Sequence, residues 1–238
     1  MMVCLASLCT VFSLPSYSQF LPDLQAKSPA EYDAYLDVLD GPATENGEAF
    51  TRAYPQSALS LPVYEILAKA WRAQGDAGQA ISAANRGLAI APDYAPLLVE
   101  LADLLCNSGG PLDRAESSAR RALEILARAK APVRIPPGVW TAAVGGLRAR
   151  AHAAIGMVRF KQNDTPGAVK EFEASLAESP SAGPALHYRL GRLYALTGRA
   201  AEARTHLDEA AKSTDPDLRS LAAAALASLP PTAASTRP

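Results

Sequence analysis

The chain has 238 residues, a formal charge of −1, and 49% hydrophobic against 20% charged side chains. This balance indicates a folded globular protein rather than a disordered one, and the lack of net positive charge argues against a nucleic-acid partner. Alanine alone supplies 49 residues. Because alanine is the strongest helix former, the composition predicts an all-α fold.

Residues 1–18 have the character of a cleavable export signal. The uncharged, mostly apolar run 3–14 is too short to span a bilayer as a helix, and the small residues Ser16 and Ser18 fit cleavage before Gln19. No Lys or Arg precedes the run, so an N-terminal segment of a cytoplasmic protein is the alternative. The first reading predicts a periplasmic or secreted protein with no stable membrane span after cleavage.

The next region, residues 19–60, is predicted to form a helical hairpin. Tyr32, Tyr35 and Leu39 recur at helical spacing within an amphipathic first segment. Gly41 and the proline that follows it break this helix, and a second helix then runs as far as the proline at position 55.

A pattern of small and large residues then occurs four times between residues 61 and 217. Its most regular part is a large residue followed by a small one, in the pairs Leu67-Ala68, Leu101-Ala102, Ile155-Gly156 and Leu190-Gly191. The first two pairs are 34 residues apart and the last two are 35 apart. In the first copy the turn Gly75-Asp76, the small Ala80 and the helix-ending Pro92 follow. Each small residue marks a close approach of two helices, and each turn reverses the chain.

Two segments depart from this period. Residues 139–161 contain no proline and predict one long helix, which extends about four turns ahead of its repeat and should project past the edge of the array. Residues 218–229 predict a final helix whose second side, with Ala223, Ala224 and Ala227, is less polar than a solubilising cap requires.

This pattern resembles the tetratricopeptide repeat (TPR), and the chain as a whole is similar to small exported bacterial TPR proteins. The resemblance implies a right-handed α-solenoid of antiparallel helix pairs with a C-terminal capping helix. It divides the chain into a signal peptide (1–18), an N-terminal hairpin (19–60), two repeats (61–131), an extended helix with two further repeats (132–217), a capping helix (218–229) and a disordered tail (230–238).

No motif for catalysis or cofactor binding accompanies the repeats. Cys106 is the one cysteine after the expected cleavage point, so neither an internal disulfide nor a cysteine-based metal site is expected. His152 and His187 hold the same place in successive repeats and could share a metal. We favour the alternative that each is an ordinary, partly buried side chain, and expect a protein that is not an enzyme and needs neither metal nor cofactor.

What the resemblance does imply is a concave groove lined by the first helices of the repeats. The positions that match the family's groove residues are Lys69, Arg72, Asn107, Arg150, Phe160, Lys161, Tyr188 and Arg192, together with Glu65, Val99, Asp103, Met157 and Leu196. The basic and aromatic members fit a peptide or partner protein with acidic and apolar side chains.

Two functions are therefore compatible with the sequence. The first is a non-enzymatic adaptor in the bacterial envelope that binds a protein segment in its groove. The alternative is a structural subunit of an assembly associated with the outer membrane, with contacts through the long helix and the alanine-rich cap.

Overall fold

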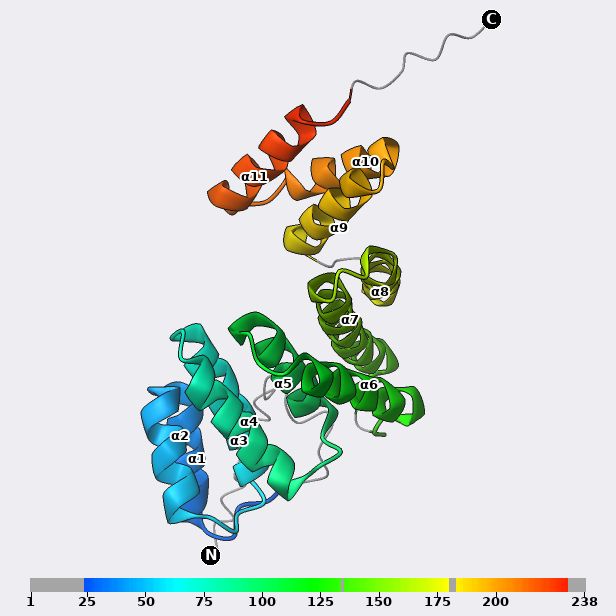
Figure 1. The fold of residues 1–238 in the computed structure, drawn as a ribbon. Helices are drawn as coiled ribbons and strands as arrows, with labels where there is room; N and C mark the ends of the chain where they lie inside the picture. The colour runs from blue at the N-terminus through cyan, green and yellow to red at the C-terminus, as the bar shows by residue number, and fades with distance from the viewer. Residues whose placement is uncertain (1–23, 134, 180–182, 231–238) are drawn as a thin grey trace, which may run out of the picture.

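The computed structural model describes residues 24–133, 135–179 and 183–230, and these ranges contain eleven α-helices and no strand. The helices follow one another as antiparallel pairs along an elongated array (Figure 1). This confirms the predicted all-α solenoid of helix pairs. The predicted signal peptide lies outside the described residues, as does the predicted tail beyond Pro230.

The helices form five pairs and a final single helix. Their bounds are α1 Pro29–Asp40, α2 Ala43–Ala53, α3 Ser60–Ala73, α4 Ala77–Ile90, α5 Ala95–Ser108, α6 Leu112–Arg128, α7 Pro137–Lys161, α8 Thr165–Glu178, α9 Pro184–Leu196, α10 Ala200–Ala210 and α11 Pro216–Ala227. The odd-numbered helices α3, α5, α7 and α9 are the first helices of four successive pairs, and we call the surface that they form the first-helix face.

The turns inside the pairs arise from local chemistry that the sequence predicts. Gly75 has a φ of 81° and Asn163 a φ of 62°, the left-handed region that glycine and asparagine tolerate best. The aspartate after each of them caps the next helix: Asp76 accepts a hydrogen bond from the backbone N–H of Gln79 at 2.9 Å. Each of these two pairs is thus closed by one left-handed residue and one capping carboxylate.

The core confirms the repeat register. Ala68, Ala80 and Ala168 are fully buried. At Gly156 an added Cβ would lie 2.6 Å from the ring of Phe172, a separation that requires a shift of one helix. The small residues therefore stand where paired helices touch.

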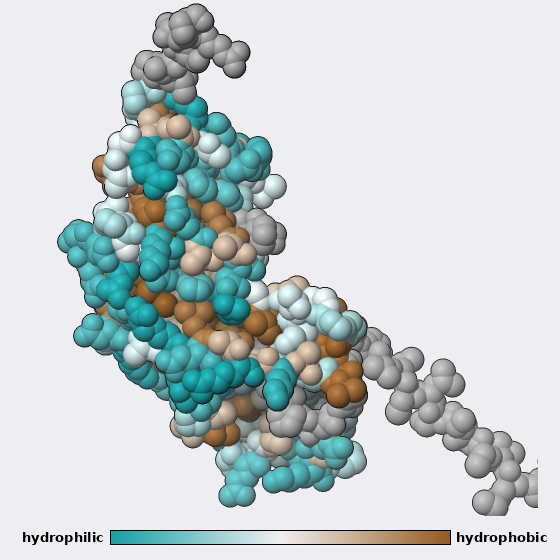
Figure 2. Space-filling model, turned by 90° about the vertical axis from the view of Figure 1, so that its right-hand side faces the viewer, coloured by the Kyte–Doolittle hydropathy of each residue, from teal (hydrophilic) through white to brown (hydrophobic). Residues whose placement is uncertain are grey.

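Buried side chains form two hydrophobic clusters. The larger runs from α1 to α7 and the smaller from α8 to α10, while Met157 on α7 packs against both. Apolar residues also reach the surface between hydrophilic ones along the middle of the face shown in Figure 2. Apolar side chains therefore lie on the surface as well as in the interior.

The long helix α7 has 25 residues, but its extension does not project freely past the array. Val144 and Leu147 pack against the larger cluster, and Arg148 forms an ion pair with Glu178 at 2.7 Å. At Gly145 the backbone comes so close to α8 that an added Cβ would lie 2.8 Å from a carbonyl oxygen of that helix. The expectation of a projecting arm is thus wrong, because this part of α7 has a second helix and a core to pack against.

The last helix, α11, covers the end of the array with little of its own surface buried. Ala222 is fully buried, whereas Leu221 is 53% exposed and Ala223, Ala224 and Ala227 are also exposed. None of the helices in the described ranges is both long and apolar enough to cross a lipid bilayer.

Candidate functional site

The predicted groove residues all belong to the first helices α3, α5, α7 and α9. Their positions are Lys69 and Arg72 on α3, Asn107 on α5, Arg150, Phe160 and Lys161 on α7, and Tyr188 and Arg192 on α9. They differ in their surroundings, and the difference divides the face into two parts.

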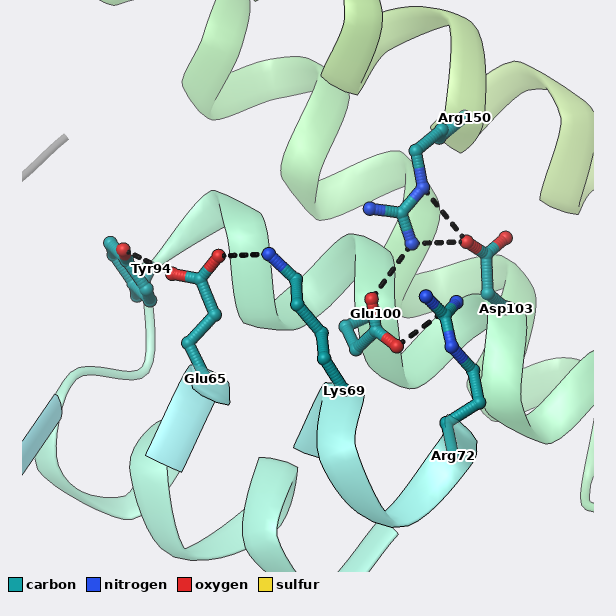
Figure 3. Close-up of polar contacts among 7 residues, drawn as sticks. All are labelled: Glu65, Lys69, Arg72, Tyr94, Glu100, Asp103 and Arg150. Carbon is teal, nitrogen blue, oxygen red and sulfur yellow. Dashed lines mark hydrogen bonds and ion pairs between the residues drawn. The ribbon is translucent and has the colours of Figure 1, made fainter. Parts of the chain in front are cut away.

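At the α3–α5–α7 end the charged side chains bind one another (Figure 3). Arg150 on α7 donates to Glu100 Oε2 at 2.8 Å and through Nε to Asp103 Oδ2 at 3.0 Å. Arg72 on α3 completes the cluster, with Nη1 3.1 Å from the second oxygen of Glu100. Glu100 has no exposed surface at all, so its charge is held inside the protein by cations from two neighbouring helices.

This arrangement keeps Arg150 ionised. Burial on its own would lower the Arg150 pKa, but the charges of Asp103 and Glu100 and the hydrogen bonds to them outweigh burial and raise it. The charged guanidinium of Arg150 therefore links α5 to α7, and the Glu100 carboxylate, which also contacts Arg72, links α5 to α3.

A second group, on α3, is also satisfied internally. Glu65 is buried and accepts hydrogen bonds from Lys69 Nζ and from the hydroxyl of Tyr94, both at 2.6 Å (Figure 3). The tyrosine stands just before α5, so this carboxylate ties α3 to the start of α5.

The predicted basic character of the groove is therefore wrong for this end of the face. Three cations, on Lys69, Arg72 and Arg150, meet three carboxylates within the chain, and the cluster has no net charge. Sequence reasoning placed two of those carboxylates, Glu65 and Asp103, at groove positions but did not predict that they would pair with the neighbouring cations. It missed Glu100 entirely, although an acidic residue inside the apolar helix α5 is itself a signal that a cation lies opposite.

Two further groove positions on α5 differ from expectation. Val99 is fully buried and belongs to the larger core cluster, so it does not face a ligand. The exposed Asn107 donates from its side-chain amide to the carbonyl of Asp103 in its own helix at 2.8 Å. The Asn107 amide is thus hydrogen-bonded to a main-chain carbonyl near the end of its own helix.

At the α7–α9 end two of the predicted cations, Lys161 and Arg192, contact neutral oxygen atoms. Lys161 donates to the main-chain carbonyl of Cys106, and Arg192 donates to the hydroxyl of Tyr188 at 3.0 Å. Within the part of the chain that the structure describes, neither cation forms an ion pair with a carboxylate. Phe160, which precedes Lys161 at the end of α7, is 46% exposed.

The histidines do not form the metal site weighed in the sequence. His152 contacts Glu171 at 2.8 Å, whereas His187 contacts His206 with their Nδ1 atoms 3.0 Å apart. The described residues contain no group of three or more side chains able to hold a metal ion. Burial raises the pKa of the Cys106 thiol to about 11, so this thiol is protonated at neutral pH and unsuited to nucleophilic chemistry.

Comparisons with known proteins agree with this architecture. Residues 159–229 match the tetratricopeptide repeat family. The chain is similar in structure to PilW, described as a widely conserved type IV pilus biogenesis factor, with 18% identity over 84% of this chain and 87% of PilW and a TM-score of 0.61. Similar values hold for Pseudomonas aeruginosa PilF (16% identity, 82% and 87% coverage, TM-score 0.58).

A third similar structure is TTC0263, a TPR protein of Thermus thermophilus, with 20% identity, 83% and 99% coverage and a TM-score of 0.52. No curated protein matches the chain in sequence. At these identities the structural likeness shows the fold, and the site is argued from this chain's own residues.

Proposed function

We propose that the chain is a non-enzymatic scaffold of the tetratricopeptide-repeat type, which binds a segment of a partner protein on its first-helix face. The observation that carries this proposal is the α7–α9 end of that face. The C-terminal halves of these two first helices carry Lys161 and Arg192, which have no acidic partner among the described residues, and the exposed Phe160 and Leu196; cations and large apolar side chains are the combination that protein interfaces use. Binding in such a protein acts through differential affinity, with no bond made or broken.

We place this scaffold in the bacterial envelope, as a periplasmic or secreted protein. Two observations support that location: the signal-like residues 1–18, and the structural likeness to PilW and PilF, of which PilW is described as a pilus biogenesis factor. Mass spectrometry of the protein recovered from the envelope fraction tests it. A mature N-terminus at Gln19 supports export, and a chain that still begins at Met1 refutes it.

The alternative function, a structural subunit of an envelope assembly, is favoured by one feature of the fold. The exposed side of α11 carries Leu221 and three exposed alanines, an unusually apolar surface for the last helix of an array. Contacts of such a subunit would use α11 rather than the first-helix face.

Photo-crosslinking in cells separates these two functions. A crosslinking amino acid replaces Leu196 at the end of α9, Leu221 on α11, or Ile90 on the second helix α4; all three side chains are large, apolar and more than half exposed. We expect a partner protein to be captured from the Leu196 position and not from the Ile90 control. Capture from Leu221 alone would favour the assembly subunit, and capture from none would contradict both functions.

A further inference from the structure

The two cations at the α7–α9 end are oriented by neutral oxygen atoms. Lys161 Nζ donates to the Cys106 carbonyl in the last turn of α5, and Arg192 donates to the Tyr188 hydroxyl one helical turn away, with its guanidinium carbon 5.9 Å from the ring centre. A carbonyl or phenol fixes the direction of a cation but does not cancel its charge. Both groups therefore keep a full positive charge in a defined position.

This differs from the other end of the same face. There Lys69, Arg72 and Arg150 each lie against a carboxylate, and two of those carboxylates are almost completely buried (Figure 3). A ligand carboxylate that approached Arg72 or Arg150 would have to compete with Glu100, whose own charge would then be left buried without compensation. That competition is unfavourable, because an unpaired buried charge is costly.

Apolar surface accompanies the uncompensated cations. Phe160 precedes Lys161 at the end of α7, and Leu196, 68% exposed, lies one turn after Arg192 on the same side of α9. Lys161 and Leu196 are 35 residues apart, so they hold equivalent places on successive first helices. The C-terminal halves of α7 and α9 thus carry two cations and two large, exposed apolar side chains on successive first helices.

We propose that the partner segment docks at this α7–α9 end, and that it is an extended protein segment with acidic residues next to a large apolar one. Its carboxylates pair with Lys161 and Arg192, and its apolar side chain packs on Phe160 and Leu196. The internally neutralised α3–α5–α7 cluster takes no part in recognising charge. This assignment rests on the proposed scaffold function and adds the chemistry and the place of binding.

Peptide display on the full purified chain tests the assignment. Random twelve-residue peptides selected on the wild-type protein are expected to be enriched in Asp or Glu next to aromatic or aliphatic residues. A selected peptide, labelled with a fluorophore, should lose affinity about tenfold or more for the double variant Lys161→Glu/Arg192→Glu, because both ion pairs become repulsions. Its affinity should also fall as salt rises.

Control variants separate position from total charge. Arg128→Glu/Lys130→Glu changes the charge by the same amount near the end of α6, away from the proposed docking site, and should leave the affinity within about twofold. Arg72→Ala, at the neutralised end, should also leave it within about twofold, whereas Phe160→Ala should weaken it about tenfold. Circular dichroism melting of each variant verifies that the fold is intact.

The possible results distinguish the two levels of the proposal. Peptides that bind the Lys161→Glu/Arg192→Glu variant as well as wild type, that lack acidic residues, or that depend on Arg72 instead would overturn the docking site and leave the scaffold function standing. If no peptide is selected, the docking site is refuted, and the crosslinking experiment then decides whether the scaffold function is refuted with it.

Discussion

Removing Arg150 should lower the free energy of unfolding more than removing Glu100, because Glu100 is fully buried and Arg150 is partly exposed. In Arg150→Met, Glu100 stays fully buried with Arg72 as its remaining cation, and Asp103 loses its partner as well. Breaking a buried ion pair from one side costs about 3–5 kcal/mol. The Arg150 side chain is 35% exposed, so water screens part of the interaction; we expect a loss of about 2–3 kcal/mol in the free energy of unfolding.

The opposite deletion should cost much less. In Glu100→Leu, Arg150 keeps its hydrogen bonds to Asp103 and its access to water, and an apolar side chain fills a site inside the apolar helix α5. Removing one partner of a buried ion pair is costly when the other is left as an uncompensated buried charge, but here Arg150 keeps Asp103 and Arg72 is 46% exposed to water. We therefore expect a change within about 1 kcal/mol for this variant, and a double variant less destabilised than the sum of the single ones.

Urea unfolding followed by circular dichroism measures both changes, provided that the slope against denaturant stays the same. Equal losses for Arg150→Met and Glu100→Leu, or a larger loss for Glu100→Leu, would refute the conclusion that Glu100 is the buried charge that depends on its neighbours. Additive effects in the double variant would refute the direct coupling between the two side chains.

Two further predictions concern the C-terminal half. Gly146→Ala and Gly156→Ala change the same residue type within α7. Nothing lies within 4 Å of a Cβ added at Gly146, so Gly146→Ala should stabilise the protein by about 0.5–1 kcal/mol. A Cβ added at Gly156 would lie 2.6 Å from Phe172, so Gly156→Ala should destabilise it by about 1–3 kcal/mol; urea unfolding measures both changes. Burial lowers the pKa of His187 and His206 below the ordinary 6.5, so the unfolded chain binds more protons just below that pH, and the urea midpoint should fall as the pH drops from about 7 to 5.5. His206→Phe should flatten this dependence, and an unchanged slope would contradict the role of the pair.

The fold could be predicted from the sequence because the packing of a helical repeat requires particular residue types at fixed positions of each copy. Small residues are needed at positions 68 and 156 because helices are in close contact there, and Asn163 suits the left-handed φ of its turn. These requirements act within one helix pair and recur about every 34 residues, so a single chain shows each of them several times.

The contacts between successive pairs were not predictable in the same way. Arg150 is 50 residues from Glu100, and no regular spacing links the two. The absence of proline predicted the length of α7 correctly, but it carried no information on what the extension would touch, and Val144 and Leu147 turned out to pack on the core. Val99 illustrates the same limit, since its place in the repeat pattern does not show that neighbouring helices cover it.

These differences change how charge on such a face is interpreted. A count of basic residues at groove positions treats each as available to a ligand, but side chains on adjacent first helices also face one another. Arg72 and Arg150 stabilise the array itself, because both bind the buried Glu100 and so link α3, α5 and α7. Lys161 and Arg192 are held by neutral oxygens and remain uncompensated. On the first-helix face, the charge available to a partner is therefore the charge left after internal pairing, and our proposal assigns partner binding to Lys161 on α7 and Arg192 on α9.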